Sequence, residues 1–279
     1  EGLARFDGAR GWKDLGLSVD VSGDWSGQLD RSHVGTGFPD WHKAVVLAKD
    51  PSEARIGFTN GATAVLPASG ASMPVRGVGG RAFDSLKPGM VIIVKQDGGA
   101  YELRSVPEIS GGMLAEEVHT GRVLAMQGGF DVVGSSYNRA IQALRQPGSA
   151  FKPIVYVTAL QNGFTPATIE MDAPFCVWQG AGLGQKCFVN FDHRSAGPHT
   201  LRWGLEQSRN LMTVRAASEI GMPKINDTAR KLGVGDYPNF LSMALGAGDT
   251  TVLRLVNAYA ILANQGRSVK PTTIDYVQD

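Results

Sequence analysis

The stretch that most constrains this chain is residues 146–153, QPGSAFKP, which leads into an apolar run. Its Pro-Gly pair favours a turn, and an apolar run closed by Gly163 is typical of a buried helix with a glycine stop. The sequence therefore predicts a helix over about 149–162. We expect Ser149 in its first turn and Lys152, three residues later, on the same face.

This Ser-x-x-Lys spacing suits nucleophilic catalysis. A serine hydroxyl is a weak nucleophile at neutral pH and needs a base within hydrogen-bond reach. Burial and nearby positive charge lower the pKa of a lysine and make it available as that base. A helix N-terminus adds partial positive charge and free N–H groups, which favour developing negative charge. A serine N-cap followed by a solvated lysine would give the same four residues, so the tetrad alone does not distinguish a catalytic pair from a helix cap.

A second polar pair, Ser208 and Asn210, lies between helical patterns at 200–207 and 211–220. On a tight link both side chains can face one cleft. There a hydroxyl can relay a proton, and an amide can hold both a lysine and a substrate carbonyl. Helix capping is the alternative, because serine and asparagine are common capping residues.

Helical patterns dominate from residue 140 to 264. Two more helices are predicted over 225–232 and 251–264, and the second is mostly apolar and expected to be buried. Residues 241–245 are expected as a short strand or an extended link, and a final strand is expected at 273–277.

The first hundred residues carry short β-like runs separated by turn residues. Five strands are predicted, over residues 41–48, 54–59, 62–67, 90–95 and 100–104. The pair Asn60-Gly61 between the second and third is a strong hairpin signal. Five short strands of this kind predict a small OB-like barrel. A separate hairpin is predicted over 112–126.

Composition narrows the classes of partner. The net charge of +1, without a basic stripe carrying interleaved aromatic residues, argues against nucleic acid or an anionic membrane surface. No run reaches the ~18 apolar residues of a membrane span, and no signal-peptide pattern occurs. The opening residues, EGLAR, resemble the middle of a longer polypeptide, so we expect any anchor outside this chain.

Two cysteines, Cys176 and Cys187, are eleven positions apart. A disulfide between them would close a short loop, stabilise the fold by ~2–3 kcal/mol and imply an oxidising compartment. Two free thiols are the first alternative. A zinc site with His193 and His199 is the second, although the spacing matches no common zinc pattern.

The order of these motifs is more specific than any one of them. A hairpin, then S-x-x-K opening a helix, then S-x-N between helices about sixty residues later resembles the penicillin-interacting serine transferases. The finer resemblance is to class A penicillin-binding proteins, the bifunctional peptidoglycan synthases. It rests on the blocks at 137–140, 145–153, 197–202, 245–246 and 258–264, and on the likeness of 41–112 to their small β domain.

The resemblance implies an α+β fold in two parts. Residues 1–108 would form a small β-rich OB-like domain, and 109–279 the N-terminal and helical part of a transpeptidase domain related to serine β-lactamases. In the family, three further strands follow the helices and complete a five-stranded sheet, so we expect the domain to be incomplete at the C-terminus.

By the same resemblance, Ser149 is the nucleophile that attacks the D-alanyl-D-alanine carbonyl of a peptidoglycan stem peptide, and Lys152 is its base. Ser208 and Asn210 would shuttle a proton and orient the substrate. An amine of a neighbouring stem would complete the cross-link, and β-lactams would acylate Ser149 as substrate mimics. No metal or organic cofactor is implied. The expected partners are stem peptides, β-lactams and cell-wall regulatory proteins at the β domain, on the periplasmic side of the bacterial inner membrane.

The chain departs from the family in two ways. It has no Lys-Thr-Gly or Lys-Ser-Gly motif, which in the family supplies positive charge and an oxyanion-hole N–H. The glycosyltransferase domain that precedes the β domain in the family does not occur in this sequence either, so we expect the chain to be a fragment of a bifunctional glycosyltransferase/transpeptidase. The resemblance therefore does not by itself predict that these 279 residues are active. The alternatives are a D,D-carboxypeptidase or β-lactamase, in which water takes the acyl group, and a catalytically silent relative that binds peptidoglycan or partner proteins.

Overall fold

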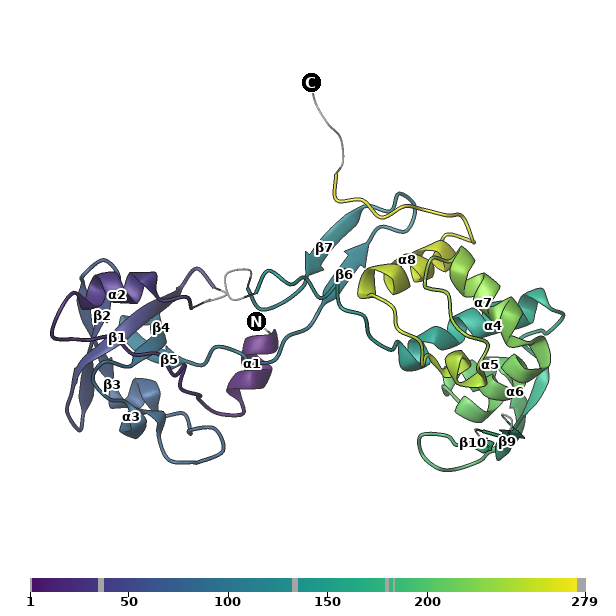
Figure 1. Cartoon of the computed structure of the whole chain (residues 1–279), viewed down its shortest axis with the longest axis horizontal. Coiled ribbons are helices and arrows are strands. Elements are labelled where there is room, and N and C mark those ends of the chain that lie inside the picture. The colour runs from purple at the N-terminus through teal and green to yellow at the C-terminus, as the bar shows by residue number, and fades with distance from the viewer. Residues whose placement is uncertain (1, 35–37, 132–134, 179–180, 183, 275–279) are drawn as a thin grey trace, which may run out of the picture. The chain divides into compact units, whose positions relative to one another are not determined.

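The computed structural model describes residues 2–34, 38–131, 135–178, 181–182 and 184–274 (Figure 1). The chain divides into two compact units. One comprises Glu1–Gly112 with Gln127–Arg139, and the other Met113–Met126 with Ala140–Asp279. Each unit has a hydrophobic core of its own. Within the described ranges, no helix is both long and apolar enough to cross a membrane.

The first unit is built on a five-stranded antiparallel sheet with strand order β3-β2-β1-β4-β5. Its strands are β1 (Trp41–Lys49), β2 (Glu53–Phe58), β3 (Thr63–Pro67), β4 (Val91–Asp97) and β5 (Ala100–Arg104). All five predicted strands are confirmed, with ends that differ by at most two residues. Gly61, at φ +80°, makes the predicted turn between β2 and β3, a backbone conformation that glycine adopts without strain.

Both faces of this sheet are covered. Ile92 and Val94 of β4 lie in the main core with Phe83 of α3 (Ala82–Ser85), whereas Val91 lies on the other face with Leu29 of α2 (Trp25–Arg31). This explains why β4 begins with four consecutive buried apolar residues rather than alternating ones. The unit also contains α1 (Gly2–Gly8) and the short 3₁₀ helix η1 (Ala68–Ala71).

The second unit is mainly helical. Its helices are α4 (Lys152–Gln161), α5 (Leu201–Glu206), α6 (Asn210–Ile220), α7 (Met222–Lys231), α8 (Val252–Ala263) and the 3₁₀ helices η2 (Gly148–Phe151) and η3 (Leu241–Leu245). The five predicted helices are confirmed. Six of the ten residues of α4 are buried, so this helix lies at the centre of the core. It ends as predicted, with Gly163 at φ +92° directly after its C-cap Asn162.

Two expectations for this unit are wrong. Residues 241–245 form η3 rather than a strand or a link, and Gly246, in the left-handed conformation, ends that helix with its N–H bonded to the Met243 carbonyl. Helix α8 is only partly buried, with Ala258, Ala260 and Ile261 as its buried residues, because only one side of it packs against the core. The final strand expected at 273–277 cannot be followed, since 275–277 lie outside the described residues.

Among the described residues, this unit also contains three pairs of short strands. They are β6 (Met113–Glu116) with β7 (Val123–Gln127), β8 (Ile169–Asp172) with β11 (Gly197–Thr200), and β9 (Phe175–Trp178) with β10 (Gln185–Phe188). The hairpin predicted over 112–126 is therefore confirmed. The Glu117 carboxylate stabilises its turn by accepting hydrogen bonds from the backbone N–H groups of His119 and Thr120.

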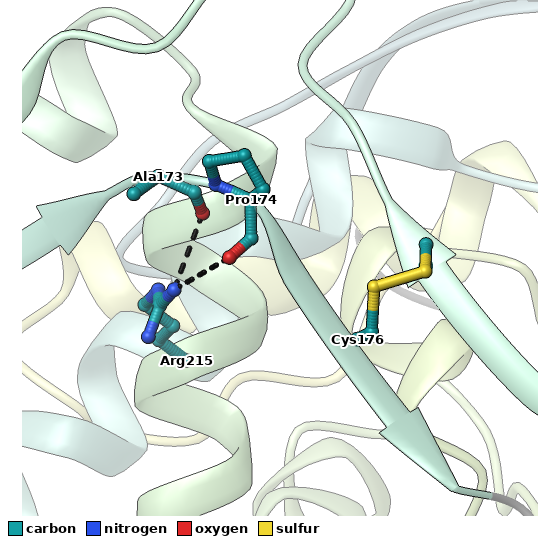
Figure 2. Close-up of a disulfide and its surroundings, with 5 residues drawn as sticks. Ala173, Pro174, Cys176 and Arg215 are labelled. Atoms are coloured by element: carbon teal, nitrogen blue, oxygen red, sulfur yellow. Dashed lines mark hydrogen bonds between the residues drawn. A yellow bond between two sulfur atoms is a disulfide. The ribbon is translucent and has the colours of Figure 1, made fainter.

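The two cysteines form a disulfide. Cys176 and Cys187 lie directly opposite each other on β9 and β10, and their sulfur atoms are bonded. No group of three or more potential ligands that could hold a metal occurs in the described part of the chain. Figure 2 shows Arg215 of α6 donating to the carbonyls of Ala173 and Pro174, which holds the start of β9 on that helix.

Removing this disulfide should destabilise the fold. We expect replacement of Cys176 and Cys187 by serine to lower the free energy of unfolding by ~2–3 kcal/mol, because the cross-link restricts the unfolded chain. Urea denaturation of both proteins, with and without reductant, measures the effect. Reductant should destabilise the wild type to the level of the double variant and leave that variant unchanged. A double variant as stable as oxidised wild type would contradict the prediction.

Candidate active site

Ser149 lies in η2, one turn before α4, in a turn held from two sides. The Gly148 N–H donates to the Gly246 carbonyl at 3.2 Å, and the Tyr259 hydroxyl of α8 donates to the Ala150 carbonyl at 2.9 Å. A Cβ atom at Gly246 would lie 2.2 Å from the Gly148 oxygen, so only glycine allows this approach. The backbone around Ser149 is therefore fixed by contacts from outside its own helix.

Lys152 is the first residue of α4, and its side chain is almost fully buried, with 1% exposed. Its Nζ donates to the Ser208 hydroxyl at 3.0 Å, to the Ser208 carbonyl, and to the Asn210 Oδ1 at 2.7 Å. The structure therefore brings together three of the four predicted site residues. They come from segments 56 to 58 residues apart in the sequence.

The surroundings of Lys152 favour its neutral form. Burial is the main cause that lowers the pKa of its ammonium group, to about 8, and the nearby Arg209 guanidinium adds positive charge in the same direction. At pH 7 a lysine with this pKa is the free base in roughly one molecule in ten, whereas an ordinary lysine is almost entirely protonated. Lys152 can therefore accept a proton near neutral pH.

Ser149 has a different environment. Its side chain is exposed, and in the described part of the chain its hydroxyl makes no hydrogen bond, to Lys152 or to any other group. Its carbonyl accepts a bond from the Lys152 backbone N–H. Hydrogen bonds of catalytic groups are often long or absent before substrate binds, so this geometry does not exclude Ser149 as nucleophile. Its role stays a prediction.

The Ser208 backbone is in an unusual conformation. Ser208 follows α5 with φ +53°, in the left-handed region that a residue with a side chain adopts at a cost of about 1–3 kcal/mol. This conformation turns both its carbonyl and its hydroxyl toward Lys152. Asn210 begins α6 two residues later. The capping interpretation of this pair is therefore insufficient, because both residues bind the lysine.

Three further residues of the site, Arg209, Asp172 and Asn190, were not among the predicted site residues. Arg209 forms an ion pair with Asp172 at 2.7 Å and another with Asp192 at 3.0 Å. Asp172 is fully buried at the end of β8, and Asn190, also buried, follows β10. Arg209 stands inside the S-x-N motif, where a charged middle residue was the one available hint. Asp172 and Asn190 are isolated polar residues, and no motif points to them.

Two family models match the chain. The model described as "Penicillin-binding protein OB-like domain" matches residues 18–109, and "Penicillin binding protein transpeptidase domain" matches 111–279.

Curated relatives match all or most of this chain. "Penicillin-binding protein 1A" of Rickettsia prowazekii is 37% identical over 283 residues, which is 100% of this chain and 35% of that protein. The protein of the same name from Neisseria gonorrhoeae is 38% identical over 200 residues, 70% of this chain and 25% of that protein. The chain thus spans about a third of the length of the Rickettsia relative.

A solved structure is similar over nearly the whole chain. The crystal structure of Penicillin-Binding Protein 1A from Haemophilus influenzae superposes with a TM-score of 0.83 and 26% identity. The match covers 99% of this chain and 41% of that protein.

Proposed function

Because this chain belongs to the penicillin-binding protein family, with an OB-like domain followed by a transpeptidase domain, we propose that it carries the D,D-transpeptidase site of a class A peptidoglycan synthase. One observation supports this most. A buried Lys152 with a pKa of about 8 lies one helical turn after Ser149 and is held by Ser208 and Asn210.

In the first step, the Ser149 Oγ attacks the carbonyl of the penultimate D-alanine of a stem peptide. Neutral Lys152 takes the hydroxyl proton, and the C–N bond to the terminal D-alanine breaks. The departing amine needs a proton, which the Ser208 hydroxyl can pass on from Lys152, since the two are 3.0 Å apart. The product is an ester between Ser149 and the shortened stem.

In the second step, an amine of a neighbouring stem attacks that ester. The amine loses a proton through the Ser208–Lys152 pair, an amide bond forms between the stems, and Ser149 regains its proton. Asn210 would orient the substrate through its amide group. A β-lactam enters the same first step, since attack on its ring carbonyl breaks the ring C–N bond and leaves Ser149 acylated.

The decisive experiment is labelling with a fluorescent penicillin, followed by mass mapping of the modified residue. We expect a single adduct on Ser149. A stem peptide offered with an acceptor amine then separates the outcomes: an amide product indicates a transpeptidase, whereas hydrolysis alone indicates a carboxypeptidase. Binding of peptidoglycan without any adduct would indicate a catalytically silent relative and would overturn the proposal.

We also propose a periplasmic location and peptidoglycan as the partner. The Cys176–Cys187 disulfide supports an oxidising compartment, and the family supports a place beside the cell wall.

The acylation rate should depend on pH through Lys152. Because burial lowers the pKa of this lysine to about 8, the neutral base becomes more abundant from pH 6 upward and levels off above pH 8. We expect the second-order rate of acylation by a β-lactam to rise about tenfold per pH unit below pH 7 and to reach a plateau near pH 9. Stopped-flow measurement, corrected for hydrolysis of the free β-lactam, tests this. A rate that is constant between pH 6 and pH 9 would contradict it.

A further inference from the structure

Asn190 caps α6 from a distant part of the chain. The N-cap residue of α6, Arg209, makes no side-chain cap of its own. Instead, the Oδ1 atom of Asn190 accepts hydrogen bonds from the backbone N–H groups of Asn210 at 2.8 Å and Leu211 at 3.2 Å. These are two of the N–H groups that a helix leaves without internal partners. Asn190 thus does for α6 what a local cap residue usually does.

The other half of the Asn190 amide is anchored as firmly. Its Nδ2 atom donates to the Asp172 Oδ1 at 2.7 Å and to the Arg194 carbonyl at 2.8 Å. Asp172 is itself held by Arg209 and by the Ala196 N–H. All four hydrogen bonds that an asparagine side chain can make are present, and Asn190 is only 3% exposed. Its orientation is therefore determined by its partners.

The same segment fixes the side chain of Asn210. The Asn210 Nδ2 donates to the Val189 carbonyl at 3.0 Å, while its Oδ1 accepts from Lys152 at 2.7 Å. A carbonyl can only accept and an ammonium can only donate, so this is the one amide orientation that satisfies both. Val189 and Asn190 together hold the backbone and the side chain of Asn210, and Asn210 in turn holds Lys152.

This segment is itself attached to rigid structure. It directly follows β10, which the disulfide links to β9, and Arg215 ties the start of β9 to α6 (Figure 2). Both ends of the disulfide hairpin are therefore bound to the helix that begins with Asn210.

We propose that Asn190 is a positioning residue for acyl transfer, which acts on Lys152 by fixing Asn210. The inference rests on the proposed function, because it assumes that Lys152 is the base.

The test compares two buried asparagines in the full chain. Asn190→Ala removes the proposed positioning contacts. Asn226→Ala is the matched control, since Asn226 is also buried and its Nδ2 also donates to two oxygens, on Tyr237 and Asn239, without touching the site. Both variants should lose thermal stability. We expect Asn190→Ala to slow β-lactam acylation by about 100-fold, the cost typical of misplaced catalytic groups, and Asn226→Ala to leave the rate within about twofold.

A second variant tests rescue. Asn190→Asp keeps an acceptor oxygen at the N-terminus of α6, where negative charge is favourable, and can share one proton with Asp172. We expect it to retain an acylation rate within about tenfold of wild type. This variant also carries the test if Asn190→Ala does not fold.

Two readouts do not depend on the reaction. In Asn190→Ala the amides of Asn210 and Leu211 should exchange with deuterium faster, and the pKa of Lys152, followed by NMR of its side chain, should fall because its charged form loses an acceptor. If wild type is never acylated, the proposed function fails, but amide exchange and the Lys152 titration still test whether Asn190 positions Asn210 and Lys152. Unchanged Lys152 titration and exchange, or equal acylation of the Asn190→Ala and Asn226→Ala proteins, would overturn the inference.

Discussion

Replacement of Ser149 by alanine should abolish covalent labelling by β-lactams and leave the fold intact. The acyl-enzyme is an ester of the Ser149 hydroxyl, and alanine offers no oxygen to form it. The side chain is exposed and makes no hydrogen bond within the described ranges, so its loss should change the free energy of unfolding by less than about 0.5 kcal/mol. Gel fluorescence after incubation with a labelled penicillin, together with a thermal melt, measures both effects.

The matched control for this variant is Ser218→Ala. Ser218 is an exposed serine on α6, so it reports what the loss of a surface hydroxyl does to labelling and stability. It should label like wild type. An adduct on the Ser149→Ala protein would mean that another residue is the nucleophile and that the proposed mechanism is wrong.

The helix after Ser149 could be predicted because its signals are local. A Pro-Gly turn, an apolar run and a glycine stop are read within fifteen or so residues, and each acts through backbone geometry. The strands of the first unit could be predicted for the same reason, since the Asn60-Gly61 turn signal and the short strand-like runs on either side of it favour one local conformation. The family models bear out the resemblance that joined these elements into a fold.

The environment of the site could not be predicted in this way. Asp172 and Asn190 act through contacts with residues up to 37 positions away, and a lone polar residue in a turn has no periodicity that reveals such contacts. The error at residues 241–245 has a related cause. A short apolar run fits a strand or a helix equally. Here the run forms a 3₁₀ helix that ends at Gly246, which is in the left-handed conformation and lies against the Gly148 backbone.

Replacement of Lys152 by methionine should slow β-lactam acylation by on the order of 10³-fold, within the range that a general base contributes. Methionine is an unbranched apolar side chain one atom shorter than lysine, so it fills most of the buried space but cannot take the Ser149 proton. Because Ser149 and Lys152 act as a unit, the double variant Ser149→Ala/Lys152→Met should lose no more of the acylation rate than Ser149→Ala alone. Lys231→Met removes the same charge from an exposed position and should acylate like wild type.

The Lys152→Met variant should also lack the part of the pH dependence of stability that comes from Lys152. Folding lowers the pKa of Lys152 from 10.5 to about 8, so between these values the unfolded chain binds more protons than the folded one. The stability of the wild type relative to the variant should therefore rise with pH across this window, by up to about 3 kcal/mol, and stay level below it. Urea denaturation of both proteins at pH 7.5 and pH 10 gives the difference. A difference that is constant or falls with pH would mean that folding does not lower the pKa of Lys152, and the case for Lys152 as the base would fail.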